Sequence, residues 1–122
     1  MTSHEQENCV CTTATELKPT IAELNDRLRC HWVGGRVAWT NGVEQLGVEA
    51  VMAAFHAIEG FDAFTPDNDP HGEHDFGSVD VLGQRFFWKI DYYDQSLEHG
   101  SPDPADPGVT TRVLTIMLAA EY

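Results

Sequence analysis

Two strand-like runs joined by a very short loop constrain the fold of this chain more than any other feature. Residues 76–82 and 85–94 are rich in β-branched and aromatic side chains, and Gly83-Gln84 lies between them. Glycine in the first place of a two-residue loop is typical of a type II′ turn, so the runs are predicted to form an antiparallel hairpin. The register that follows pairs Leu82 with Arg85, Val81 with Phe86, Val79 with Trp88, Gly77 with Ile90 and Asp75 with Tyr92.

Because side chains alternate along a strand, this hairpin is predicted to have one core face and one more polar face. The core face is expected to bury Val79, Val81, Phe86, Trp88 and Ile90. Trp39 and Tyr92 are also expected in the core. The other face receives a mixed polar and aromatic set, typical of either a ligand surface or a salt-bridged exterior: His74, Phe76, Ser78, Asp80, Phe87, Lys89, Asp91 and Tyr93.

The remaining elements follow from hydrophobic periodicity and turn residues. A helical stripe predicts a first helix over 19–30 with Pro19 in its first turn, and a second stripe predicts a helix over 46–59 closed by Gly60. A short strand is predicted over 36–40. The apolar run 111–118 is predicted to be a central strand, with a helix as the lesser alternative. The predicted class is α+β, two helices packed on a small, mainly antiparallel sheet, in the order helix, strand, helix, strand, strand, strand.

The expected organisation is a flexible N-terminal tail over residues 1–16 followed by a single α+β domain over 17–122. The sequence shows neither a long apolar run nor a secretory leader, so a cytoplasmic protein without membrane contact is expected. Three cysteines, with Cys9 and Cys11 one residue apart, do not indicate a disulfide framework, and Cys30 is predicted to pack as a small apolar residue.

Acidic residues dominate the charge of the chain, with twenty Asp and Glu against seven Lys and Arg, a net charge of −13. No Lys or Arg lies between Arg36 and Arg85, or between Lys89 and Arg112. Such a field repels nucleic acid and acidic membranes, so a basic protein surface is the expected partner, unless the charge only maintains solubility. The candidate binding acids are Asp62, Asp67, Asp69, Glu73, Asp75, Asp94, Asp103 and Asp106.

The densest group of potential ligands lies in residues 67–75, where carboxylates and imidazoles alternate with turn residues. An EF-hand register fails, because Ser78 stands where the bidentate acid is required. The alternative is structural, with the side chains of Asp67, Asn68 and Asp75 bonding loop amides. No cofactor is therefore predicted, while a divalent metal stays open, with Asp67, Asp69, His71 and His74 as its candidate ligands.

One arrangement on the polar hairpin face could support acid–base chemistry. His74 is expected beside Lys89 and Asp91, which could orient it, with Asp75 adjacent in the chain. The competing interpretation is that Lys89 forms only a surface ion pair with Asp80 or Asp91. The sequence alone does not decide whether the protein is an enzyme.

Four longer segments carry a resemblance to a known family: 64–77, 87–94, 100–107 and 111–118. With them, the chain over about residues 19–122 resembles an uncharacterised bacterial family of unknown function that is frequent on plasmids and prophage-like elements. The resemblance implies no activity and no catalytic residues. It implies a context in which small proteins are often accessory factors, including inhibitors of host defence.

Two functions therefore compete. The first is a non-enzymatic acidic binding module, including a nucleic-acid mimic that inhibits a host defence or DNA-handling protein. The alternative is a small metal-assisted hydrolase that uses His74, Asp75, Lys89 and Asp91. Oligomeric state and the identity of partner or substrate stay open.

Overall fold

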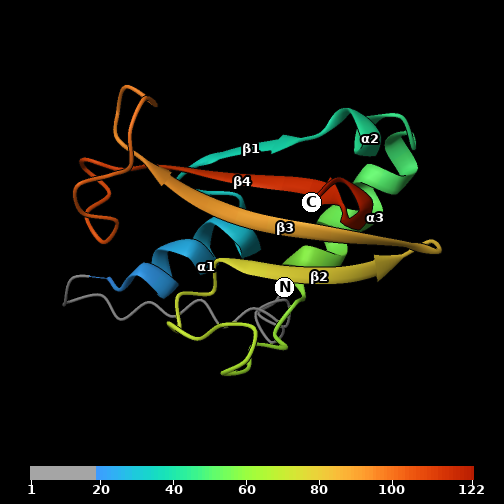
Figure 1. The fold of residues 1–122 in the computed structure, drawn as a ribbon, viewed down its shortest axis with the longest axis horizontal. Coiled ribbons are helices and arrows are strands. Elements are labelled where there is room, and N and C mark those ends of the chain that lie inside the picture. The colour runs from blue at the N-terminus through green and yellow to red at the C-terminus, as the bar shows by residue number, and fades with distance from the viewer. Residues whose placement is uncertain (1–18) are drawn as a thin grey trace, which may run out of the picture.

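A computed structural model describes residues 19–122 as a four-stranded sheet with its two longer helices packed on one face (Figure 1). The predicted class, α+β, is confirmed, and so is the predicted order of the main elements. Two short helices add to that order. The elements are α1 (Ile21–His31), β1 (Arg36–Trp39), α2 (Asn41–Glu44), α3 (Val48–Glu59), β2 (Phe76–Val81), β3 (Gln84–Tyr93), β4 (Thr111–Leu118) and the 3₁₀ turn η2 (Ala119–Glu121).

Strand β4 occupies a central place in the sheet, as its apolar, β-branched sequence predicts. The strand order is β1-β4-β3-β2, with β4 parallel to β1 and antiparallel to β3. Two of the three pairings are antiparallel, so the sheet is mainly antiparallel. The last strand in sequence thus joins β1 to the β2–β3 hairpin, which explains why it carries apolar residues on both faces.

The helix boundaries are set by side-chain caps. Thr20 accepts a hydrogen bond from the Glu23 N–H, and the Glu23 carboxylate accepts one from the Thr20 N–H. This capping box begins α1 at Ile21, later than predicted, and leaves Pro19 outside the helix. Thr40 in turn caps the additional short helix α2, which begins at Asn41.

The hairpin forms, but its predicted register is wrong by two positions. The loop residues are Leu82 and Gly83, with φ of 53° and 79°, which is the backbone pattern of a type I′ turn. Trp88 consequently faces Gly77 instead of Val79. A shift of two leaves the faces unchanged, so the predicted burial is confirmed for Phe86, Trp88 and Ile90, while Ser78 and Asp80 are exposed.

The hydrophobic core lies between the sheet and the two longer helices. Leu28 of α1 and Ile58 of α3 meet Trp88 and Ile116 there, all fully buried. The prediction that Trp39 lies in the core is wrong. Trp39 belongs to the edge strand β1 and is 39% exposed. Tyr92 is half-buried.

Cys30 is buried, as predicted for a small apolar residue, and it is also disulfide-bonded, which the cysteine pattern did not indicate. Cys9, Cys11 and the predicted tail over 1–16 lie outside the described residues. Within the described part of the chain, no helix has the length and apolar character needed to cross a membrane.

Candidate functional site

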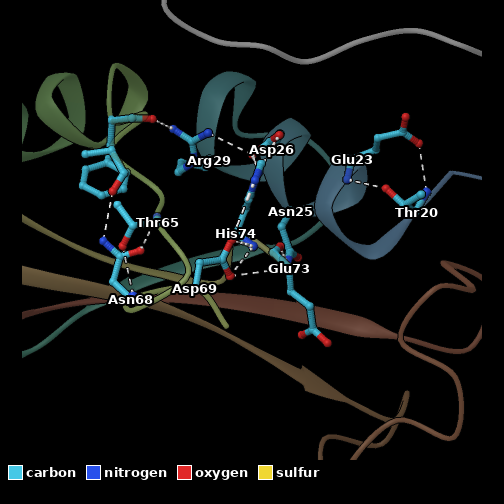
Figure 2. Close-up of polar contacts among 12 residues, drawn as sticks. Thr20, Glu23, Asn25, Asp26, Arg29, Thr65, Asn68, Asp69, Glu73 and His74 are labelled. Atoms are coloured by element: carbon cyan, nitrogen blue, oxygen red, sulfur yellow. Dashed lines mark hydrogen bonds and ion pairs between the residues drawn. The ribbon is translucent and has the colours of Figure 1, made fainter. Parts of the chain in front are cut away.

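A group of polar side chains is enclosed between α1 and the loop over residues 61–75 (Figure 2). We call it the Asp26–His74 cluster. Buried polar groups of this density require mutual hydrogen bonds, since an unpaired buried charge is costly. Its members are Asn25, Asp26 and Arg29 from α1, and Asp69, Glu73 and His74 from the loop.

Asp26 is the centre of the cluster and is only 4% exposed. Both of its carboxylate oxygens lie 3.1 Å from Nδ1 of His74. Nη2 of Arg29 donates to Oδ1 of Asp26 at 2.9 Å, while Nη1 donates to the carbonyl oxygens of Ile58 at 3.0 Å and Phe61 at 2.7 Å. Arg29 therefore neutralises Asp26 and also ties the end of α3 to α1.

His74 is held in place from several directions. Its backbone is in the left-handed region, with φ of 58°, and its N–H donates to Asp69 Oδ1 at 3.2 Å. The imidazole stacks on Phe64 with ring centroids 4.0 Å apart and an angle of 5°. Nε2 lies 3.8 Å from Oδ2 of Asp69, so each ring nitrogen has a carboxylate nearby. The side chain is 30% exposed, and its orientation is fixed.

A second set of bonds extends the cluster to the sheet. Asn25 is fully buried, and its Nδ2 donates to the carbonyl oxygen of Glu73 and to the Tyr92 hydroxyl, both at 2.9 Å. The Tyr92 hydroxyl donates to Glu73 Oε1 at 2.8 Å, and burial raises the pKa of Tyr92. Nε of Arg112 donates to Asn25 Oδ1 at 2.7 Å. These contacts explain how β3 and β4 are fastened to α1.

An open depression of about 490 Å³ lies beside His74, lined by loop residues that include Phe64, Pro66, Asp69 and His71. The loop is braced internally, because the Thr65 N–H donates to Asn68 Oδ1 at 2.8 Å and the Asn68 N–H donates to Thr65 Oγ1 at 3.2 Å. The structural interpretation is thus confirmed for Asn68, and Asp69, for which it was not predicted, accepts from the loop N–H groups of Glu73 and His74 in the same way.

The four candidate metal ligands do not form one group. Asp69 is buried and bonded to the loop backbone, His74 contacts Asp26, and both Asp67 and His71 are exposed. Among residues 19–122, no three His, Cys, Asp or Glu side chains gather closely enough to hold a metal ion. A metal bound by Asp67, Asp69, His71 and His74 stays a prediction.

The four residues of the hydrolase alternative lie in different places. Lys89 Nζ contacts Asp91 Oδ2 at 2.8 Å on the helix-free face of the sheet, and this hydrogen bond raises the pKa of Lys89. His74 lies instead on the helix side, contrary to the predicted face, because its left-handed backbone and the bonds to Asp69 direct it toward α1. Asp75 has a raised pKa, through burial first and then the charge of Glu73.

The candidate binding acids also differ in their surroundings. Asp62 and Asp67 are exposed and show no bond to another described residue, whereas Asp69 is buried. Others brace their own loops. Asp94 accepts from Ser96, which lowers its pKa; Asp103 accepts from Ala105; and Asp106 accepts from Gly108. Glu73 is held by Tyr92.

Four residues that organise the cluster were not among the predicted site residues: Asn25, Asp26, Arg29 and Arg112. A signal was present in the predicted first helix, where Asn25 follows Ile21 by four positions and precedes Leu28 by three. That position falls on the apolar side of the helix, where a polar residue indicates a buried hydrogen-bond partner. The partners themselves lie up to 87 residues away and leave no local pattern.

The fold and the cluster define a small acidic α+β domain in which one helix is bonded to a long braced loop. The chain belongs to the family described as "Protein of unknown function (DUF3768)", which matches residues 39–121. Asp69, Glu73, His74, Tyr92 and Arg112 fall inside the match, and their α1 partners precede it. Neither the curated proteins nor the solved structures include a match to this chain.

Proposed function

We propose that this protein is a non-enzymatic acidic binding module whose exposed carboxylates engage a basic protein surface. The observation that supports this most is the distribution of charge. Residues 19–122 contain seventeen acids and six bases, and the buried charges, Asp26, Asp69, Arg29 and Arg112, cancel. The remaining fifteen acids and four bases leave −11 on the outer part of the domain.

The four bases outside the core offset little of this negative charge. Arg85 Nε donates to Asp80 at 2.8 Å, and Lys89 pairs with Asp91, so each of these cations is matched locally by an acid. Arg27 and Arg36 are the other two bases outside the core. A field of this kind attracts cationic partners and raises their rate of association.

In its finer form, the proposal is that the acidic surface mimics nucleic acid and inhibits a host defence or DNA-handling protein in the cytoplasm. Its supports are the excess of carboxylates and the resemblance to a bacterial family frequent on mobile elements. Asp62 and Asp67 are the best candidates for contact with the basic partner, since both are exposed and neither bonds another described residue.

The test is retention of proteins from bacterial lysate on the immobilised full chain at about 50 mM and about 500 mM NaCl. The proposal expects basic proteins to be retained at low salt and released at high salt. A Glu49→Lys, Asp62→Lys, Asp67→Lys variant is the matched control and should retain less. Competition by duplex DNA for a retained protein would support mimicry. If the same proteins are retained at both salt concentrations and equally by the charge-reversed variant, the proposal is contradicted.

A small hydrolase is the second candidate, and the contact between Asp26 and His74 beside the open depression favours it. A carboxylate that holds an imidazole is the arrangement of a general base, and a divalent metal would supply electrophilic assistance. Hydrolysis of ester or phosphodiester probes with Mn²⁺ or Zn²⁺ would identify it, provided that His74→Ala and Asp26→Asn abolish the turnover. Turnover that tolerates both changes would argue against this site.

A further inference from the structure

An apolar groove of about 280 Å³ opens at the end of the sheet where β1 meets α3. We call it the Trp39 groove. Its lining includes large side chains that are unusually exposed: Val48 is 76% exposed, Met52 49% and Trp39 39%. Exposed apolar side chains that gather around a hollow typically mark a binding surface. The side chains that line it, beside Gly47, belong to Trp39, Glu44, Val48, Val51, Met52 and Phe55.

Rigid elements build this groove. Val48, Met52 and Phe55 recur along α3 at the spacing that places them on one side of the helix. Trp39 meets Phe55 edge-on with ring centroids 5.6 Å apart, and its Nε1 donates to Glu44 Oε1 at 2.5 Å. The indole is therefore fixed as one wall of the groove, with a carboxylate beside it.

Among residues 19–122, no strand pairs with the outer edge of β1, which runs next to the groove. In this part of the chain β1 pairs with β4 alone and ends the strand order. The Thr40 N–H donates to the Ile116 carbonyl oxygen, and because bonding alternates along a strand, Val37 and Trp39 direct their N–H and C=O groups away from β4. An extended segment could add to this edge and place every second side chain toward the groove.

The charge around the groove selects among possible occupants. Glu44 lines it, Glu49 follows Val48 and is exposed, and the sequence has no Lys or Arg between Arg36 and Arg85. A second copy would bring another chain of charge −13 to the same edge, which like-charge repulsion disfavours. An apolar segment flanked by Lys or Arg would place an apolar side chain in the groove and positive charges beside Glu44 and Glu49.

We propose that the β1 edge and the Trp39 groove bind an extended basic segment of a partner protein, with one apolar side chain in the groove and Lys or Arg two residues to either side. This inference rests on the proposed function and names its docking site. The flanking cations meet Glu44 and Glu49, and the indole of Trp39 offers a face to a Lys stem or a guanidinium.

The experiment uses two synthetic peptides and the full chain. One peptide has the sequence Lys-Thr-Lys-Thr-Leu-Thr-Lys-Thr-Lys, and its control replaces Leu by Ser at the same charge. Fluorescence anisotropy at about 20 mM and about 500 mM NaCl separates the charge contribution from the groove contribution. The Leu peptide is expected to bind about ten-fold tighter than the Ser peptide at both salt concentrations, since burial of a leucine does not depend on screening.

Two variants test the groove itself. Met52→Asp and Val48→Asp each add a negative charge, so capture by charge alone predicts equal or tighter binding. The groove predicts the opposite, a loss of most of the advantage of the Leu peptide. Leu82→Asp is the matched control, because Leu82 is 69% exposed and lies on the β2–β3 turn at the other edge of the sheet. It should leave the advantage unchanged.

The outcomes separate the two proposals. Equal binding of the Leu and Ser peptides, or an advantage that survives both groove variants, overturns the docking site while leaving an acidic binding module intact. Failure of the Leu peptide to bind even at low salt also overturns the docking site. A ten-fold advantage without any salt dependence of either peptide would contradict the electrostatic function and support the groove alone. Thermal unfolding of each variant verifies that it is folded.

Discussion

Nδ1 of His74 lies 3.1 Å from both carboxylate oxygens of Asp26, although 48 positions of sequence separate the two residues. Arg29 completes this contact from the next turn of α1, and it is buried to 2% exposure. The loop over 61–75 is thereby fastened to the helix through the nearly fully buried Asp26 and Arg29 and the partly exposed His74. Loss of the buried charge of Asp26 or Arg29 should therefore affect stability more than a surface change would.

Arg29→Met should destabilise the fold by about 3–5 kcal/mol, because it leaves Asp26 as a buried charge without its guanidinium partner. The carbonyl oxygens of Ile58 and Phe61 would lose a donor as well. Urea unfolding measures the loss. Arg27→Met is the control on the same helix, and it should cost less than about 1 kcal/mol. Similar losses for the two variants would contradict a central role for Arg29.

Gly77→Ala should cost about 1–3 kcal/mol through overpacking. A Cβ at this position would lie 2.6 Å from Trp88 Nε1, and Trp88 is fully buried, so the indole cannot retreat into solvent. Gly60→Ala provides the comparison, because its nearest neighbour would be the His56 carbonyl oxygen at 3.8 Å. Thermal unfolding should separate the two variants, and equal melting temperatures would argue against a close contact at Gly77.

The main elements of this fold were predictable because their signals are local. The stripe that contains Leu24 and Leu28 indicates α1, and the two-sided apolar run 111–118 indicates a central strand. The faces of the hairpin also follow from alternation alone. Its register did not, because Gly83 fits the second place of a type I′ turn as well as the first place of a type II′ turn.

The candidate site was predictable only in part. His74 and Asp69 stand out in sequence as polar residues in a dense acidic loop, but their partner Asp26 is on another element. Long-range pairing of charges depends on how α1 packs on the sheet, and no periodicity encodes it. The same holds for the Trp39 groove, since Trp39 looks like a core residue until the sheet order places β1 at an edge.

Leu82→Asn should stabilise the protein by about 0.5–1 kcal/mol, because a leucine pays a steric penalty in the left-handed region that asparagine largely avoids. Leu82 has φ of 53° and is 69% exposed, so little apolar burial is lost. Leu82→Ala shortens the side chain without easing the backbone and should show no such gain. The prediction fails if Leu82→Asn melts at or below the temperature of the unchanged chain.

Asp75→Asn should raise the melting temperature near pH 7. Burial and the charge of Glu73 raise the pKa of Asp75 in the fold, so the ionised carboxylate is less favourable there than in the unfolded chain. That cost is present above the folded pKa and disappears as the pH falls below the ordinary value of about 3.9. The advantage of the variant should therefore shrink on acidification. A constant advantage from pH 7 to pH 3.5 would contradict this origin.

Reversal of exposed acids should weaken partner binding in small, cumulative steps. Asp62→Lys and Asp67→Lys act on carboxylates that are exposed and bonded to no other described residue, so they change charge with little effect on the fold. Each should slow association with a retained basic partner by about two- to five-fold, and the pair should compound. Stopped-flow association at several ionic strengths measures this, because screening acts over about 10 Å at 0.1 M salt.

Two further variants decide whether charge or one particular side chain carries the binding. Gln84→Glu adds an exposed acid on the hairpin and should speed association slightly, opposite in sign to the Lys variants. His74→Ala removes the imidazole of the Asp26–His74 cluster and should leave association unchanged at temperatures where the variant is folded. If His74→Ala alone abolishes activity while Asp62→Lys and Asp67→Lys are tolerated, function resides in the cluster and the hydrolase candidate replaces the binding module.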